Sequence, residues 1–118
     1  MDGRPHRKLI VWQKAMELVH EIYKTTATFP KNEEYGLSSQ MRRAVVSVPS
    51  NLAEGAARKG NKEFKQFLNI AQGSLSELDT QVELAQTLGY VVSERYEELM
   101  LKMTEISKMF FGLAKTLK

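Results

Sequence analysis

Apolar residues recur at steps of three or four positions along most of this chain, a spacing that predicts amphipathic helices rather than strands. The longest seams run from Phe64 to Ala85 and from Tyr96 to Leu117, and both keep the heptad phase of packed antiparallel helices. Shorter seams run from Trp12 to Thr26 and from Leu37 to Ala56. We therefore predict an all-α fold, an antiparallel up-down-up-down four-helix bundle.

Helix-breaking and turn-forming residues set the limits of these four segments. Pro30 ends the first helix, and Gly60 and Gly89 separate the last three. The 118 residues are enough for one hydrophobic core and too few for two. We expect a flexible N-terminal tail over residues 1–8 and a single bundle domain over residues 9–118.

The segment from Gly36 to Arg58 carries three features besides its apolar seam. Ser38 is a suitable N-cap at the start of the helix. Pro49 lacks the backbone donor that a helix interior needs, so we expect a kink near this residue. Gly55 lowers helix propensity by about 1 kcal/mol relative to alanine, which indicates either close approach of another backbone or unwinding of the helix end.

A polar stripe follows the same spacing on a neighbouring face of this second helix: Gln40, Arg43, Ser47, Asn51 and Glu54. A purely solvated face would not need so many small and amide side chains, so we expect a partner surface here. The sequence leaves open whether the stripe lines a ligand pocket or forms a subunit contact. Arg43 and Glu54 are too far apart on one helix to pair with each other, so each needs a partner on another helix or a neighbouring subunit, such as Glu77 or Asp79 for Arg43.

Six large apolar residues fall outside the seams: Val11, Leu18, Ile70, Leu84, Leu101 and Phe111. Single exposed apolar residues are common on protein surfaces, but a group of this size favours a contact between subunits. The pattern supports association without fixing the number of subunits.

Positive charge is concentrated in one part of the chain, although the formal net charge is only +3. Residues 42–65 hold six basic side chains against two acidic ones, whereas residues 74–105 hold seven acidic against two basic. Such segregation favours self-association or an anionic partner. The candidate nucleic-acid-binding residues are Arg42, Arg43, Arg58, Lys59, Lys62 and Lys65. Four of them surround the turn before the third helix, where phosphate contacts are easy to make, but a merely solvated helix end explains them equally well.

Groups that would support catalysis are scarce. The chain has no cysteine and only two histidines, and His20 lies among charged residues on the solvated side of the first helix. No Glu-x-x-His, HExxH or glycine-rich phosphate motif occurs. We therefore predict a non-enzymatic protein with no catalytic residue, no metal site and no cofactor. No apolar run is long enough for a membrane span or a signal peptide, so we expect a cytoplasmic protein without a membrane partner.

Several sequence motifs are more specific than the helical pattern. They are WQKA at residues 12–15, GLSSQMRRA at 36–44, SVPSNLAEG at 47–55, EFKQFLNIAQGSLSEL at 63–78, and the FP and LGY turns. Together they resemble the four-helix-bundle family of 23S ribosomal RNA intervening-sequence proteins, and the similarity covers residues 8–117. The resemblance implies a ring-like homopentamer without a defined biochemical role. Relatives with the same fold are accessory proteins of diversity-generating retroelements, which implies RNA, DNA or a reverse-transcriptase-like protein as partner.

Two classes of function remain open on the sequence alone. In the first, the chain is a non-enzymatic accessory module whose basic residues contact RNA, DNA or a nucleic-acid enzyme. In the second, it is a structural scaffold, in which Arg43 and Glu54 only join subunits. Binding that weakens steeply with salt would indicate the first class, because phosphate contacts release counterions.

Overall fold

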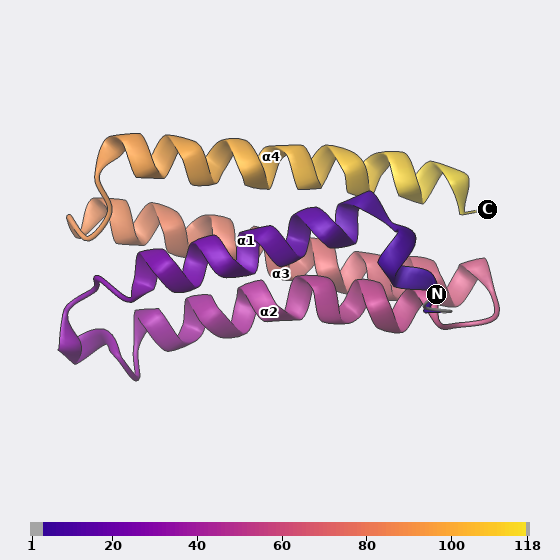
Figure 1. Ribbon diagram of the computed structural model, residues 1–118, viewed down its shortest axis with the longest axis horizontal. Helices are drawn as coiled ribbons and strands as arrows, with labels where there is room; N and C mark the ends of the chain where they lie inside the picture. The colour runs from indigo at the N-terminus through magenta and orange to yellow at the C-terminus, as the bar shows by residue number, and fades with distance from the viewer. Residues whose placement is uncertain (1–3, 118) are drawn as a thin grey trace.

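The computed structural model describes residues 4–117, and these residues form four long helices (Figure 1). The helices are α1 (Ile10–Thr26), α2 (Leu37–Ala56), α3 (Asn61–Thr87) and α4 (Ser93–Thr116). Successive helices run in opposite directions along one long axis in Figure 1. Within the described range there is no strand. The predicted all-α, up-down-up-down bundle is therefore confirmed.

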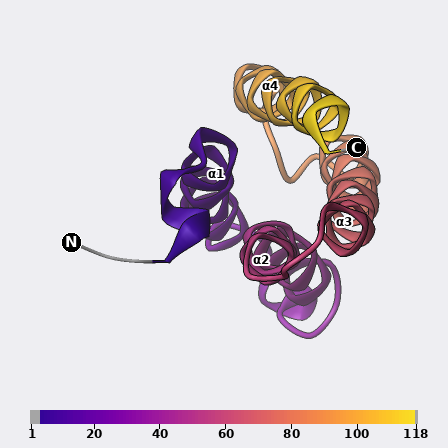
Figure 2. The same ribbon diagram turned by 90° about the vertical axis from the view of Figure 1, so that its right-hand side faces the viewer.

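The end-on view in Figure 2 shows how the helices are ordered around the core: α2 lies between α1 and α3, and α4 lies next to α3. The pairing of α2 with α3 is the most extensive, and that of α1 with α4 is the least extensive of the four neighbouring pairs. Most of the predicted site residues lie on α2, on α3 or in the turn between them. The most extensive helix pair of the bundle therefore positions them.

The N-terminal segment lies against the start of α1. Pro5–Lys8 form a 3₁₀ turn, the Gln13 side-chain amide donates a hydrogen bond to the Arg7 carbonyl at 2.9 Å, and the rings of His6 and Trp12 meet edge to face. Residues 1–3 of the predicted tail lie outside the described residues. The flexibility of residues 1–8 stays a prediction.

The core contains the seams that the sequence predicts for α2, α3 and α4. The fully or almost fully buried side chains of these helices include Met41, Val45, Val48, Leu52, Leu68, Leu78, Val82, Leu99, Met103, Ile106 and Phe110. Burying each large apolar side chain contributes about 1.5–3 kcal/mol, so this shared interior is the main source of stability.

The predicted seam of α1 is partly wrong. Val11 and Leu18, expected outside the seam, are buried in the core, whereas Trp12 and Val19 are only partly buried beside it. The physical reason is that α1 packs against both α2 and α4, so its buried stripe is wider than one heptad seam. The other four off-seam residues, including Ile70 and Leu84, are exposed as expected.

The start of α2 differs from the prediction. Ser38 is not the N-cap, because α2 begins at Leu37 and the N-cap position is therefore Gly36. The free backbone amide of Leu37 instead donates a hydrogen bond to Glu33 Oε1 at 3.0 Å. Glu33 reaches this amide from the 3₁₀ turn Lys31–Glu33, and a carboxylate at this end of a helix also complements the helix dipole.

The interior of α2 stays helical through Pro49, which is buried. The predicted bend of the axis at this residue stays a prediction. At Gly55 the structure shows the close approach that the sequence suggested. A Cβ atom there would lie 2.9 Å from the Phe67 Cβ and 3.3 Å from the Phe64 carbonyl oxygen. The glycine therefore permits close approach of α3, and it is also the last residue but one of α2, which ends at Ala56.

Candidate functional site

The middle of the polar stripe joins α2 to α3. The Ser47 and Ser74 hydroxyls share a hydrogen bond of 2.7 Å. The Asn51 side-chain amide donates to the Ser47 carbonyl oxygen at 2.8 Å and to its hydroxyl oxygen at 2.9 Å. Because each of these groups is satisfied within the chain, Ser47 and Asn51 serve helix pairing before they serve any ligand.

The start of the stripe borders a shallow groove between α2 and α3, with a volume of about 320 Å³. Gln40, Arg43, Ser47, Ser74 and Glu77 line it. Arg43 is exposed and forms no ion pair with any described residue, so the expected intrachain pairing with Glu77 or Asp79 is not present. An unpaired guanidinium beside a groove is free to meet an external carboxylate or phosphate.

The end of the stripe belongs to a different part of the surface. Glu54 pairs with Arg58 at 3.6 Å, and the Arg58 guanidinium also approaches Glu63 at 4.0 Å and stacks over the Phe67 ring at 4.8 Å. Arg58 thus ties the end of α2 to the first turns of α3. The stripe predicted from the sequence therefore does not form one continuous pocket.

Arg42 is also engaged within the chain. Its Nε donates a hydrogen bond to the Thr26 hydroxyl at 2.8 Å, and its guanidinium lies 4.7 Å from the centre of the Tyr23 ring. Both partners belong to the last turns of α1, where a cation also complements the helix dipole. Arg42 therefore joins α2 to the end of α1, and this contact occupies part of its guanidinium.

The six candidate nucleic-acid-binding residues do not form a single cluster. Arg43 lies thirteen positions before Ala56, the last residue of α2, which is about 20 Å along the helix axis at 1.5 Å per residue, and Arg58 lies beyond that end. Four of the six residues surround the turn between α2 and α3. This surface, here named the basic turn, consists of Arg58, Lys59, Lys62 and Lys65. Its three lysines are exposed and have no ion-pair partner among the described residues.

The basic turn gains a cation that the sequence analysis missed. Lys65 lines a hollow of about 530 Å³ together with Phe111, Ala114 and Lys115 of α4. Figure 1 shows the reason, because the end of α4 and the α2–α3 turn lie at the same end of the bundle. Lys115 is fifty positions from Lys65 in the sequence, so only the helix order could have suggested that they meet.

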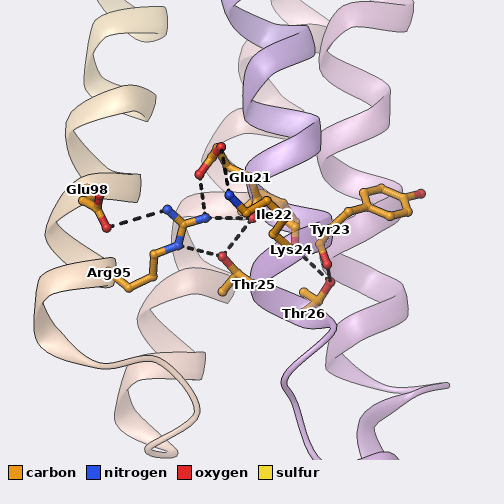
Figure 3. Close-up of polar contacts among 8 residues, drawn as sticks. All are labelled: Glu21, Ile22, Tyr23, Lys24, Thr25, Thr26, Arg95 and Glu98. Atoms are coloured by element: carbon orange, nitrogen blue, oxygen red, sulfur yellow. Dashed lines mark hydrogen bonds and ion pairs between the residues drawn. The ribbon is translucent and has the colours of Figure 1, made fainter.

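A second missed group, here named the Arg95 clasp, joins the start of α4 to α1 (Figure 3). The Arg95 guanidinium lies 2.7 Å from the Glu21 carboxylate and donates hydrogen bonds to the Thr25 hydroxyl at 2.9 Å and to the Glu21 carbonyl oxygen at 3.0 Å. The hydrogen bond and the charge of Arg95 hold the pKa of Glu21 below its ordinary value.

Two tyrosines bind carboxylates near the same end of the bundle. The Tyr90 hydroxyl donates to Glu33 Oε2 at 2.8 Å. The bonds from the Leu37 amide and from Tyr90 lower the pKa of Glu33. The Tyr96 hydroxyl donates to Glu83, which raises the pKa of Tyr96 to about 12. These contacts link loops and helices to each other, and they show no nucleophile beside a base.

Two further features of residues 4–117 bear on the expected chemistry. No three histidine, aspartate or glutamate side chains there are grouped so that they could hold a metal ion. None of the helices in that range combines the length and the apolar character that crossing a bilayer requires.

These features define an all-helical bundle with charged surfaces at both ends of its second helix. The model of the 23S rRNA-intervening sequence protein family matches residues 7–112, and the chain belongs to this family. A crystal structure of a protein of unknown function from the S23 ribosomal protein family of Bacteroides thetaiotaomicron is similar, with a TM-score of 0.81 and 28% sequence identity. The match covers 90% of this chain and 99% of that one. A comparison with curated proteins finds no match.

Proposed function

We propose that this protein is a non-enzymatic accessory bundle that binds nucleic acid through the basic turn. The observation that supports this proposal is the set of lysines at residues 59, 62 and 65, which are exposed and unpaired. Lys115 adds a positive charge from α4. The nearby acidic groups, Glu54 and Glu63, are both held by Arg58. Five cations against two carboxylates leave a surface that attracts phosphate.

The expected ligand surface is the phosphate backbone rather than the bases. Lysine is a flexible point charge that contacts phosphate without reading sequence, so binding through these residues will be largely independent of sequence. Its affinity depends steeply on salt, with a log–log slope of about −0.7 for each phosphate contact on a single strand.

The test is a binding measurement on the double variant Lys59→Glu, Lys62→Glu, which leaves the Arg58 contacts in place. Single-stranded RNA and duplex DNA are titrated at about 50 mM and about 200 mM salt. We expect wild-type binding at the lower concentration, and a loss of about tenfold or more in the variant. The matched control is Lys31→Glu, Lys108→Glu, which makes the same change in net charge at exposed positions on other surfaces.

Two results would contradict the basic turn as a nucleic-acid site. One is the absence of wild-type binding at the lower salt concentration. The other is an equal loss of nucleic-acid affinity in the two double variants, because the change in net charge alone would then explain the loss. Either result would favour the alternative function, a structural scaffold without nucleic-acid binding.

We also propose that the protein is a homo-oligomer, with a pentamer the state that the family resemblance implies. The exposed face of α3 supports association. Ile70 is 51% exposed and Leu84 is 48% exposed, and Gly73, between them on the same helix, has no atom of another residue within 4 Å of a Cβ placed there. No other helix therefore packs closely against Gly73 within the described chain, which leaves this position open to a second copy.

Static light scattering tests this association. Wild type at tens of micromolar is expected to have a mass that is a multiple of 13.5 kDa, and the double variant Ile70→Glu, Leu84→Glu is expected to be a monomer because it buries two carboxylates in the contact. The control is Leu88→Glu, Val92→Glu, which changes two exposed apolar residues in and beside the α3–α4 connection. A monomeric wild type, or an α3 variant with unchanged mass, would refute this interface.

A further inference from the structure

A second hollow, larger than the groove between α2 and α3, opens on the neighbouring face of α2, and Arg43 and Ser47 line both. Its volume is about 570 Å³. It lies between the last turns of α1, the α1–α2 connection and the first turns of α2, and its lining includes Tyr23, Glu34, Tyr35, Ser39, Arg43 and Val46. It is remote from the basic turn, which lies at the other end of α2.

Two aromatic rings contribute to this hollow. Tyr35 is 92% exposed, although a ring of this size normally buries much of its surface in a folded protein. Tyr23 is also exposed, and Arg42 stacks on its ring at 4.7 Å while bonded to the Thr26 hydroxyl. One ring is thus held in position by the bundle, and the other stands free in the connecting segment.

The charged side chains that line the hollow differ in how many contacts they already make with other groups of the chain. Arg42 is bonded to α1, whereas Arg43 has no ion pair among residues 4–117. Glu34 is the carboxylate on the rim, and neighbouring Glu33 is occupied by the Leu37 amide and the Tyr90 hydroxyl. Arg42 and Arg43 both line the hollow, and Arg43 is the one whose guanidinium has no partner within residues 4–117. Glu34 is an acceptor for a donor group on a ligand.

We propose that this hollow binds a nucleotide, with its base against Tyr35 and Tyr23 and its phosphate on Arg43. Stacking on aromatic side chains holds bases of any sequence, and the planar guanidinium fits phosphate oxygens in a two-pronged contact. Glu34 accepts a hydrogen bond from a ribose hydroxyl or a base amine, and it disfavours a bare polyanion. A duplex hides the faces of its bases, so the ligand is a free nucleotide or a residue of a single strand.

These two sources of the ligand differ in what they require. A ligand that is one residue of a bound single strand rests on the proposed function, because the same strand would also contact the basic turn. The free nucleotide does not depend on that function. The experiment therefore uses adenosine monophosphate and a short single-stranded oligoadenylate as separate probes of the full chain.

The chain carries four tyrosines, so fluorine NMR of protein labelled with 3-fluorotyrosine reports on the hollow directly. We expect both probes to shift the signals of Tyr23 and Tyr35. The signal of Tyr96 is the internal control, since this hydroxyl is bonded to Glu83 and its ring does not line the hollow. Replacement of each tyrosine by phenylalanine assigns the four signals.

Two substitutions on the surface of the hollow test the assigned roles. Tyr35→Ala removes a ring that is almost entirely in solvent, and we expect affinity for either probe to fall about tenfold. Arg43→Gln removes the phosphate contact, and we expect a similar loss together with a salt slope reduced by about one phosphate contact. The control is Lys31→Gln, which removes one exposed cation outside the hollow.

The outcomes separate this inference from the proposed function. Shifts at Tyr23 and Tyr35 that weaken in both variants support the site, and a response to the mononucleotide alone supports a free-nucleotide site. Inorganic phosphate that shifts these signals as strongly as adenosine monophosphate would overturn the role of the base. Unmoved signals would overturn the site altogether. If oligonucleotide binding then still depends on Lys59 and Lys62, the proposed function stands without this hollow.

Discussion

Replacing Gly55 with valine is expected to lower the free energy of unfolding by about 3 kcal/mol, at the upper end of the usual cost of overpacking a core. A Cβ atom at this position would lie 2.9 Å from both Phe64 Cδ1 and Phe67 Cβ. The Phe64 ring could rotate away, but the Phe67 Cβ and the Phe64 carbonyl oxygen are fixed to α3. The two helices must therefore separate at this position.

Urea unfolding followed by far-ultraviolet circular dichroism measures this effect, at one fixed protein concentration because association adds to apparent stability. The matched control is Gly112→Ala, since Gly112 lies within α4 and a Cβ there meets nothing within 4 Å. This control is expected to gain up to about 1 kcal/mol from helix propensity. Unchanged or increased stability of Gly55→Val would show that α3 does not constrain this position.

The periodicity of the sequence predicts most of the fold, because burial of one helix face is a local property of the pattern. The apolar residues of α3 and of α4 each fit only one heptad phase, and the predicted seams line the core. In α1 two phases compete, since Val11 and Leu18 have the same spacing as Trp12 and Val19. Only the contacts with two neighbouring helices decide which pair is buried.

The candidate site was less predictable, because its contacts join residues that are distant in sequence. Arg43 lies in the first half of α2 and Arg58 follows the end of this helix, so the rise of about 1.5 Å per residue already places them too far apart for one patch. The engagement of Arg42 by Thr26 depends on how α1 meets α2, and no spacing signals it. That Lys65 and Lys115 line the same hollow likewise follows only from the order of the helices around the core.

Replacing Arg95 with methionine is expected to cost about 2 kcal/mol of stability at neutral pH. The Arg95 and Glu21 side chains are 22% and 19% exposed, so their ion pair is only partly screened by water. Methionine keeps the apolar packing of the arginine stem, but it leaves the Glu21 carboxylate and the Thr25 hydroxyl without this donor. The stability of Arg95→Lys is expected to fall between those of wild type and Arg95→Met, because one ammonium group cannot reproduce the several contacts of the planar guanidinium (Figure 3).

The acid dependence of unfolding distinguishes loss of the ion pair from loss of packing. Because the folded-state pKa of Glu21 is below its ordinary value of 4.5, its ionised form contributes stability above that pH. This contribution is lost as pH falls through the lower pKa of the folded state. Wild type is therefore expected to lose more stability than Arg95→Met between pH 7 and about pH 3, so their difference narrows. Glu33, whose pKa is lowered in both proteins, cancels in this comparison. Urea titrations at each pH measure the difference in unfolding free energy between wild type and Arg95→Met. A difference that stays constant down to acid pH would assign the effect of Arg95 to its uncharged contacts alone.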